Sequence, residues 1–226
     1  MHPFKTLTSG FLFTLLVVNG LLNGVKAQAV ELVVQDQHGD PLANTVIEWH
    51  VEGGTAEANL PVAIMDQVDK AFSPEMLVIQ QGQRVNFPNS DNIRHHVYSF
   101  SQAKKFELKL YSGQPKQPVK FNNSGIAVLG CNIHDSMVGY VYIANSPNYV
   151  VTDQQGRAQV NLPKGVNSMT AWHALNRTGP ESRMTLSHNS IVSSGNTPFS
   201  ITLVTTKPAP RNTFQSKFRH DTQNKP

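Results

Sequence analysis

The feature that most limits the folds open to this chain is the absence of any long amphipathic helical pattern. Its apolar residues alternate with polar ones or form short β-branched runs. Gly, Pro, Asn and Asp separate these runs at short intervals. This pattern is typical of many short strands connected by turns. The sequence therefore predicts an all-β fold, and the spacing of the strands favours β-sandwiches.

The expected strands run through most of the chain. They are Val30–Gln35, Thr45–Val51, Glu75–Gln80, Arg84–Pro88, His96–Phe100, Phe106–Leu110, Val119–Asn122, Ala127–Cys131, Val138–Ala144, Arg157–Leu162, Ser168–Trp172, Arg183–Ser187 and Phe199–Val204. In the segment 106–110 apolar residues alternate with Glu107 and Lys109, which predicts an apolar inner side and a charged outer side.

The first 27 residues have the layout of a secretory signal peptide. Lys5 precedes a mostly apolar stretch from Gly10 to Leu22, and Val25 and Ala27 are small residues placed for cleavage after Ala27. The apolar stretch is short for a membrane span, although an uncleaved anchor is the alternative. Cleavage would make the protein periplasmic or secreted, with no stable membrane insertion afterwards.

Net charge argues against one class of partner. The leader contains Lys5 and Lys26 and no acidic residue, so its removal lowers the formal net charge from +4 to +2. Removal of 27 of the 226 residues leaves 199, enough for one large or two small domains. Such a weak positive charge predicts no general attraction to nucleic acid.

Cys131 is the only cysteine, and its neighbourhood carries the main chemical signal. The segment "VLGCNIHDSMVGYVYI" places His134 three residues after Cys131 and Met137 three residues after His134. A single cysteine cannot form an internal disulfide, and in an oxidising compartment a bare thiol is a liability unless it is buried or bound to a metal. Upstream, the polar loop after residue 88 ends in His95 and His96.

Together these residues form a candidate metal-ligand set. A trigonal site of two His and one Cys with a weak axial Met is typical of blue copper. Zinc would accept the cysteine and the histidines, but Met is an unusual zinc ligand. The spacing also fits, because the six residues between Cys131 and Val138 are expected to loop under the metal, while the His95 region supplies the remaining ligand.

The block from 60 to 145 resembles a cupredoxin of the plastocyanin and amicyanin kind. The shared motifs are "GQRVNFPNSD", "HHV", "CNIH" and "MVGYV". The two residues between His134 and Met137 match amicyanin, and "HHVYSF", "CNIHDSMVGY" and the later "AWH" resemble cupredoxin-like methylamine utilisation proteins. The resemblance implies a cupredoxin Greek-key β-sandwich with one copper per chain, bound by His95, Cys131, His134 and Met137.

Three positions differ from the family's pattern. His96 stands where the family has Asn, and Asn132 and Ile133 replace the usual Ser or Thr and the frequent Pro. The ligands stay intact, but the hydrogen bonds around them, and hence the reduction potential, differ. Side-chain alternation along a strand favours His95 over His96 as the ligand, with His96 the alternative.

The segments on either side of this block resemble the two ends of a carboxypeptidase regulatory-like sandwich. "ELVVQDQHGDPLANTVIEW" and "YVVTDQQGRAQVNLPKGVNSMTAWH" each read as strand, turn, strand. The expected organisation is a cupredoxin domain at 60–145, inserted in or packed beside a second small β-sandwich formed by 28–59 and 146–205. Residues 206–226 are polar and mildly basic and predict a disordered tail. His173, beside Trp172, would need a hydrogen-bond partner if buried.

The function expected from these residues is one-electron transfer to and from a transient redox protein partner. The alternative is a structural or interaction β-sandwich with a vestigial or copper-storing site. The chain is not expected to be an enzyme. A thiol hydrolase would need an Asn or Asp that orients the histidine, and a copper oxidase or nitrite reductase would need a second, His-rich copper site. A dinuclear copper centre would need a second cysteine.

Overall fold

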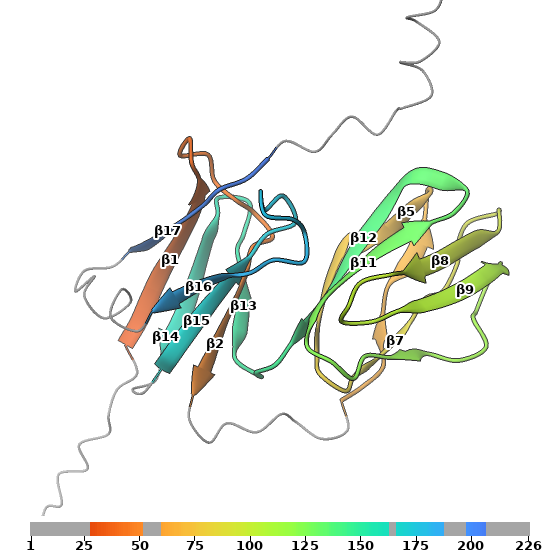
Figure 1. Ribbon diagram of the computed structural model, residues 1–226, viewed down its shortest axis with the longest axis horizontal. Coiled ribbons are helices and arrows are strands. Elements are labelled where there is room, and N and C mark those ends of the chain that lie inside the picture. The colour runs from red at the N-terminus through yellow and green to blue at the C-terminus, as the bar shows by residue number, and fades with distance from the viewer. Residues whose placement is uncertain (1–27, 52–59, 163–165, 188–197, 207–226) are drawn as a thin grey trace, which may run out of the picture.

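The structure, a computed structural model, describes residues 28–51, 60–162, 166–187 and 198–206. All of its regular elements are strands, as the sequence predicts. Figure 1 shows two groups of sheets that lie side by side. The predicted leader (1–27), nearly all of the predicted tail (207–226) and the segment 52–59 lie outside the described residues. No helix in the described part of the chain could cross a membrane.

One group of sheets is built from the two ends of the chain. A three-stranded sheet has the order β14-β1-β17 and a four-stranded sheet has the order β13-β2-β15-β16. Their strands are β1 (Gln28–Asp36), β2 (Val46–Val51), β13 (Tyr149–Val151), β14 (Arg157–Leu162), β15 (Val166–Trp172), β16 (Met184–Ser187) and β17 (Phe199–Leu203). β1 pairs antiparallel with β14 and parallel with β17. Apolar residues from both sheets, including Leu32, Ile47 and Met169, form one buried core.

The other group is built from the middle of the chain. A five-stranded sheet has the order β6-β12-β11-β8-β9, with a three-stranded sheet β10-β7-β3 and a hairpin β4-β5. Their strands are β3 (Ala63–Ile64), β4 (Asp66–Val68), β5 (Ala71–Ser73), β6 (Met76–Gln80), β7 (Arg84–Asn86), β8 (His95–Ser99), β9 (Phe106–Tyr111), β10 (Val119–Lys120), β11 (Gly125–Cys131) and β12 (His134–Ala144). Their core includes Phe87, Phe121 and Val97, all fully buried.

The pairing pattern bears on how the chain is organised. Within the described residues, strands β3 to β12 share sheets only with one another, and so do β1, β2 and β13 to β17. This separation supports the proposal that residues 60–145 are a unit inserted between two halves of a flanking sandwich. Here we call the two groups the central unit and the flanking unit.

A third apolar cluster joins the central and flanking units. It combines Tyr140 and Tyr142 of β12 with Val46 of β2 and Trp172 of β15. Tyr140 and Tyr142 each lie 5.7 Å from the Trp172 ring, between centroids. Residues 141 and 143 of the same strand belong to the core of the central unit instead. Both faces of β12 are therefore covered, which explains its continuous apolar run, since a strand buried on both sides has no polar face.

The buried carboxylate of Glu48 stabilises the contact between the central and flanking units. Glu48 of β2 is fully buried and accepts hydrogen bonds from the Tyr142 hydroxyl and from the backbone N–H groups of Asn145 and Ser146, each at 2.7 Å. The Arg183 guanidinium lies 3.7 Å from Glu48 and stacks over the Tyr142 ring at 4.5 Å. The carboxylate thus obtains the partners that a buried charge needs, and most of them belong to the end of β12.

Three details differ from the predicted strands. The short strands β3, β4 and β5 were not predicted, because two or three residues are too few to show a period, whereas β13 is the strand expected before the turn in "YVVTDQQG". Leu110 is 52% exposed rather than inward, because a bulge in the β8–β9 pairing turns the end of β9 over. β12 begins at His134, so the predicted six-residue loop is a two-residue turn at 132–133.

His173 has the partner that its burial requires, and it provides a pH test. Its Nδ1 accepts the N–H of Leu175 at 3.2 Å. Burial lowers the pKa of His173, against a hydrogen bond to the backbone of Ala43 that raises it. A base whose pKa is lower in the folded state binds its proton more weakly there than in the unfolded chain. Stability should therefore fall as the pH drops below about 6.5, the unfolded value. In His173→Gln, the free energy of unfolding should change less between pH 7.5 and pH 5; an unaltered slope would contradict this prediction.

Candidate metal centre

Strand β8 carries two adjacent histidines on opposite faces. Side chains alternate along a strand, so His95 and His96 cannot face the same way. His95 is fully buried and points to the interior, where it meets Cys131. His96 is 8% exposed, and its Nε2 lies 2.8 Å from the Glu107 carboxylate of β9. The structure thus brings His95, and not His96, to the cysteine.

The other two members come from the connection between β11 and β12. Cys131 ends β11, is 3% exposed and has no disulfide partner. His134 begins β12 after the turn at 132–133, and the two residues face each other as a pair. The register between the strands then shifts, so that Gly130 pairs with Val138. This bulge lets the short connection keep the half-buried His134 beside Cys131.

The distances among the three side chains suit a bound metal. Cys131 Sγ lies 3.8 Å from His95 Nδ1 and 3.7 Å from His134 Nδ1. Metal bonds of about 2.0 Å to nitrogen and 2.3 Å to sulfur would place S and N about 3.7 Å apart in a planar three-ligand array. Among the described residues, these three form the one group of three or more His, Cys, Asp or Glu side chains placed to hold a metal ion. The donor atoms therefore already stand at coordinating separations.

Met137 lies close by in the sequence and in the same core. It is 1% exposed and belongs to the apolar cluster that contains Cys131. The burial fits either a packed core residue or an axial thioether, and its role as the fourth ligand stays a prediction.

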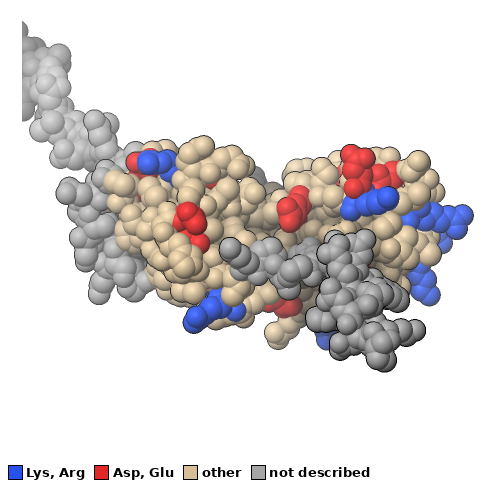
Figure 2. All heavy atoms as spheres, turned by 90° about the horizontal axis from the view of Figure 1, so that it is seen from above, with Lys and Arg blue, Asp and Glu red and all other residues tan. Residues whose placement is uncertain are grey.

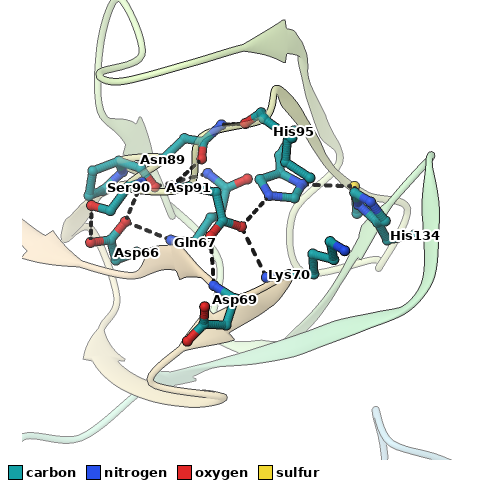
Figure 3. A network of polar contacts seen from close by, with 12 residues as sticks. Asp66, Gln67, Asp69, Lys70, Asn89, Ser90, Asp91, His95 and His134 are labelled. Atoms are coloured by element: carbon teal, nitrogen blue, oxygen red, sulfur yellow. Dashed lines mark hydrogen bonds and ion pairs between the residues drawn. The ribbon is translucent and has the colours of Figure 1, made fainter.

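Asp91 determines which nitrogen of His95 faces the cysteine. Its Oδ2 lies 2.6 Å from His95 Nε2 (Figure 3). Burial would raise the pKa of Asp91, but hydrogen bonds from the N–H of Lys70, from His95 and from the N–H of Asp69 hold the pKa below its ordinary value. An ionised carboxylate can only accept a hydrogen bond, so the proton resides on Nε2. His95 Nδ1 is thereby directed to Cys131, in the carboxylate–histidine arrangement common at metal sites.

Further polar contacts hold the loop that carries Asp91. The Asn89 side-chain amide donates to the carbonyls of Ile93 and Tyr111. The Asp66 carboxylate of β4 accepts the hydroxyl and the N–H of Ser90 (Figure 3). The sequence analysis missed Asp66 and Asp91. The polar stretch "NSDNIRHH" was a signal, but Asp66, Asp69 and Lys70, which contact its side chains, lie more than twenty residues away.

The environment of His134 favours its neutral form. Burial lowers the pKa of His134, and the nearby charges of His95 and Lys70 lower it further, against a raising effect from Asp91. A neutral imidazole has the free lone pair that a metal ligand needs. The centroids of the two histidine rings lie 5.0 Å apart, the rings are tilted by 59°, and both Nδ1 atoms face Cys131 Sγ.

Removing the Asp91 carboxylate should weaken metal binding without removing a ligand. In Asp91→Asn, His95 loses its charge-assisted partner, and the β4–β5 turn loses an acceptor. We expect Cu(II) affinity to fall about 10- to 100-fold, the usual cost of losing such an outer partner. A competition titration measures it. The matched control is Asp135→Asn, an exposed aspartate beside His134. Equal losses in the two variants would assign the effect to general charge.

Comparisons with known proteins were informative only at the level of structure. No protein-family model matches the chain, and no curated protein matches it. The copper-containing nitrite reductase from Thermus scotoductus SA-01 is 24% identical with a TM-score of 0.36, over 43% of this chain and 25% of the enzyme's chain. A purple cupredoxin from Nitrosopumilus maritimus is 21% identical with a TM-score of 0.33, over 36% of this chain and 99% of its own.

Amicyanin from Paracoccus versutus is 19% identical with a TM-score of 0.32, over 43% of this chain and 97% of its own. These structural neighbours are cupredoxins. The chain therefore has cupredoxins as structural neighbours, as the motifs predict, and spans about a quarter of the nitrite reductase.

Proposed function

We propose that this protein is an exported mononuclear copper protein that carries single electrons. The observation that supports it best is the convergence of one thiolate and two imidazole nitrogens at 3.7–3.8 Å, from the start of β8 and from the connection between β11 and β12. Soft sulfur with imidazole favours copper over metals that prefer oxygen. Bound copper would supply a centre that accepts and releases one electron.

Each residue of the site would have a distinct role as a copper ligand. Cys131 would be the strongest ligand, His95 and His134 would complete the plane, and Met137 would be the axial ligand. The sheet that bears His95 and Cys131 would hold the same geometry in both oxidation states, because strands β8 and β11 each have a neighbouring strand on both sides. The buried thiol would also be protected from the oxidants of a periplasmic or extracellular environment.

Electrons would enter and leave at the edge of His134. This residue is half-buried, and its neighbour Ile133 is 51% exposed. An exposed apolar residue beside an accessible ligand suits the small, transient contacts of redox partners. On the face drawn in Figure 2, acidic and basic groups are interspersed in a mostly uncharged surface.

The test is an absorption and EPR titration of residues 28–226 with Cu(II). An intense visible band with narrow copper hyperfine splitting, at one copper per chain and with reversible reduction, would support the electron carrier. A pale, ordinary Cu(II) spectrum or no binding would overturn it and favour the structural β-sandwich. A stronger affinity for Zn(II) than for copper would likewise contradict a redox role.

A further inference from the structure

The β4–β5 hairpin ends in an unusual turn beside the metal centre. Asp69 and Lys70, between β4 and β5, both have positive φ angles, of 54° and 59°. Residues with a side chain rarely adopt this left-handed conformation, and each instance persists only where its surroundings hold it. Here the Asp91 carboxylate accepts the N–H of Asp69 at 2.7 Å and the N–H of Lys70 at 3.0 Å. The turn is therefore fixed in space by the residue that also binds His95.

This attachment brings one cation close to the ligand cluster. The Lys70 N–H and His95 Nε2 share the same oxygen of Asp91. In Figure 3 the Lys70 side chain points from the turn toward His134. Among the described residues no carboxylate forms an ion pair with Lys70.

Several other charges surround the cluster, and their placement differs. Asp91 is already engaged by His95 and by two backbone N–H groups. Asp69, Arg94 and Asp135 are exposed, so water screens their charges. Lys70 is exposed as well, but its backbone N–H is hydrogen-bonded to Asp91 and its side chain points toward His134.

We propose that Lys70 tunes the metal centre by favouring its reduced state. A bound copper ion has one more positive charge when oxidised, so a fixed ammonium nearby opposes the oxidised state more than the reduced one. Asp91 would act in the opposite direction through His95. The hairpin thus places a cation and an anion of opposing effect on the same centre. This inference rests on the proposed function, because it requires that the cluster binds copper.

The experiment compares Lys70→Gln, Lys70→Glu and Lys70→Arg with the unaltered protein. Dissociation constants for Cu(II) and Cu(I) are measured by competition with chelators, and the midpoint potential by redox titration. In Lys70→Gln, Cu(II) binding should tighten relative to Cu(I) by about fivefold, as expected for one charge near a partly exposed site. That ratio corresponds to a fall of about 40 mV in the midpoint potential at 59 mV per tenfold.

The variants separate charge from structure. Lys70→Glu should shift the Cu(II)/Cu(I) ratio further in the same direction. Lys70→Arg keeps the positive charge and should leave the ratio as in the unaltered protein. All three variants keep a side chain on the left-handed backbone, so a difference among them reports the charge. The control is Lys105→Gln. Lys105 immediately precedes β9, whereas Tyr111, the residue that pairs with His95, lies at the other end of that strand. This variant should leave the Cu(II)/Cu(I) ratio unchanged.

Two kinds of failure can be told apart. If the unaltered protein binds no redox-active copper, the proposed function itself is wrong. If copper binds and cycles, but Lys70→Gln and Lys70→Glu leave the Cu(II)/Cu(I) ratio as it was, or Lys70→Arg shifts it as much as Lys70→Gln does, the tuning role of Lys70 is overturned while the electron carrier stands.

Discussion

Replacing Cys131 with serine is expected to abolish the intense visible absorption of the copper-loaded protein. Cys131 Sγ is the atom from which both histidine nitrogens are 3.7–3.8 Å away, so its loss removes the centre of the cluster. A hydroxyl is a weak, hard ligand and cannot replace a thiolate for copper. Cu(II) affinity should fall by more than the 10- to 100-fold that losing an outer partner costs. The measurement is an optical and EPR titration of the variant.

The control for this experiment is His50→Gln. His50 is a histidine of the flanking unit whose ring lies 3.7 Å from Glu48, away from the metal cluster. This variant should bind one copper with an unchanged spectrum. If Cys131→Ser kept the visible band, or if His50→Gln lost it, the copper would be bound elsewhere. Because serine is close to cysteine in size, circular dichroism of the metal-free variant should be unchanged, which separates ligand loss from misfolding.

Glu48→Ala is expected to destabilise the protein by about 3–5 kcal/mol, the cost of breaking a buried ion pair by removing one partner. The substitution leaves the Tyr142 hydroxyl and the N–H groups of Asn145 and Ser146 without their acceptor. It also leaves the Arg183 guanidinium without its carboxylate. Chemical denaturation followed by circular dichroism measures the loss.

The comparison for Glu48→Ala is Glu31→Ala, which removes a surface carboxylate. Glu31 pairs with Arg157 at 2.7 Å, but the side chains of this pair are 28% and 53% exposed. Such a pair contributes about 0–1 kcal/mol. A loss for Glu48→Ala no greater than for Glu31→Ala would show that the contact between the central and flanking units does not depend on this carboxylate. Two separate unfolding transitions in the unaltered protein would also argue against the fastening role of Glu48.

Several parts of the fold were predictable because they depend on neighbours along the chain. A strand shows its period of two over five or more residues, and Arg157–Leu162 has the same bounds in the prediction and in the structure. The inward side of β9 was predicted correctly for Phe106 and Leu108, which pack in the core. The prediction was wrong for Leu110, because a bulge depends on how two strands pair and leaves no mark on one of them.

The candidate site likewise has some residues that local sequence spacing predicts and others that only distant contacts bring in. Cys131, His134 and Met137 lie within seven residues, so their spacing alone predicted a copper-type ligand set. Strand alternation favoured His95, and the structure places it beside Cys131 while His96 faces Glu107. Nothing in the local sequence linked Asp91 to the turn at Asp69 and Lys70, because that contact spans more than twenty residues.

The sequence by itself thus determined the all-β class, the positions of most strands and the donor types of the candidate metal site, because alternation and short spacings are local properties. Only the tertiary structure decided which nitrogen of His95 meets the thiol, which cation lies beside His134 and how Glu48 joins the two units. These features require residues from distant strands to meet at hydrogen-bonding distance. Such meetings depend on register and packing, which a pattern along one strand does not contain.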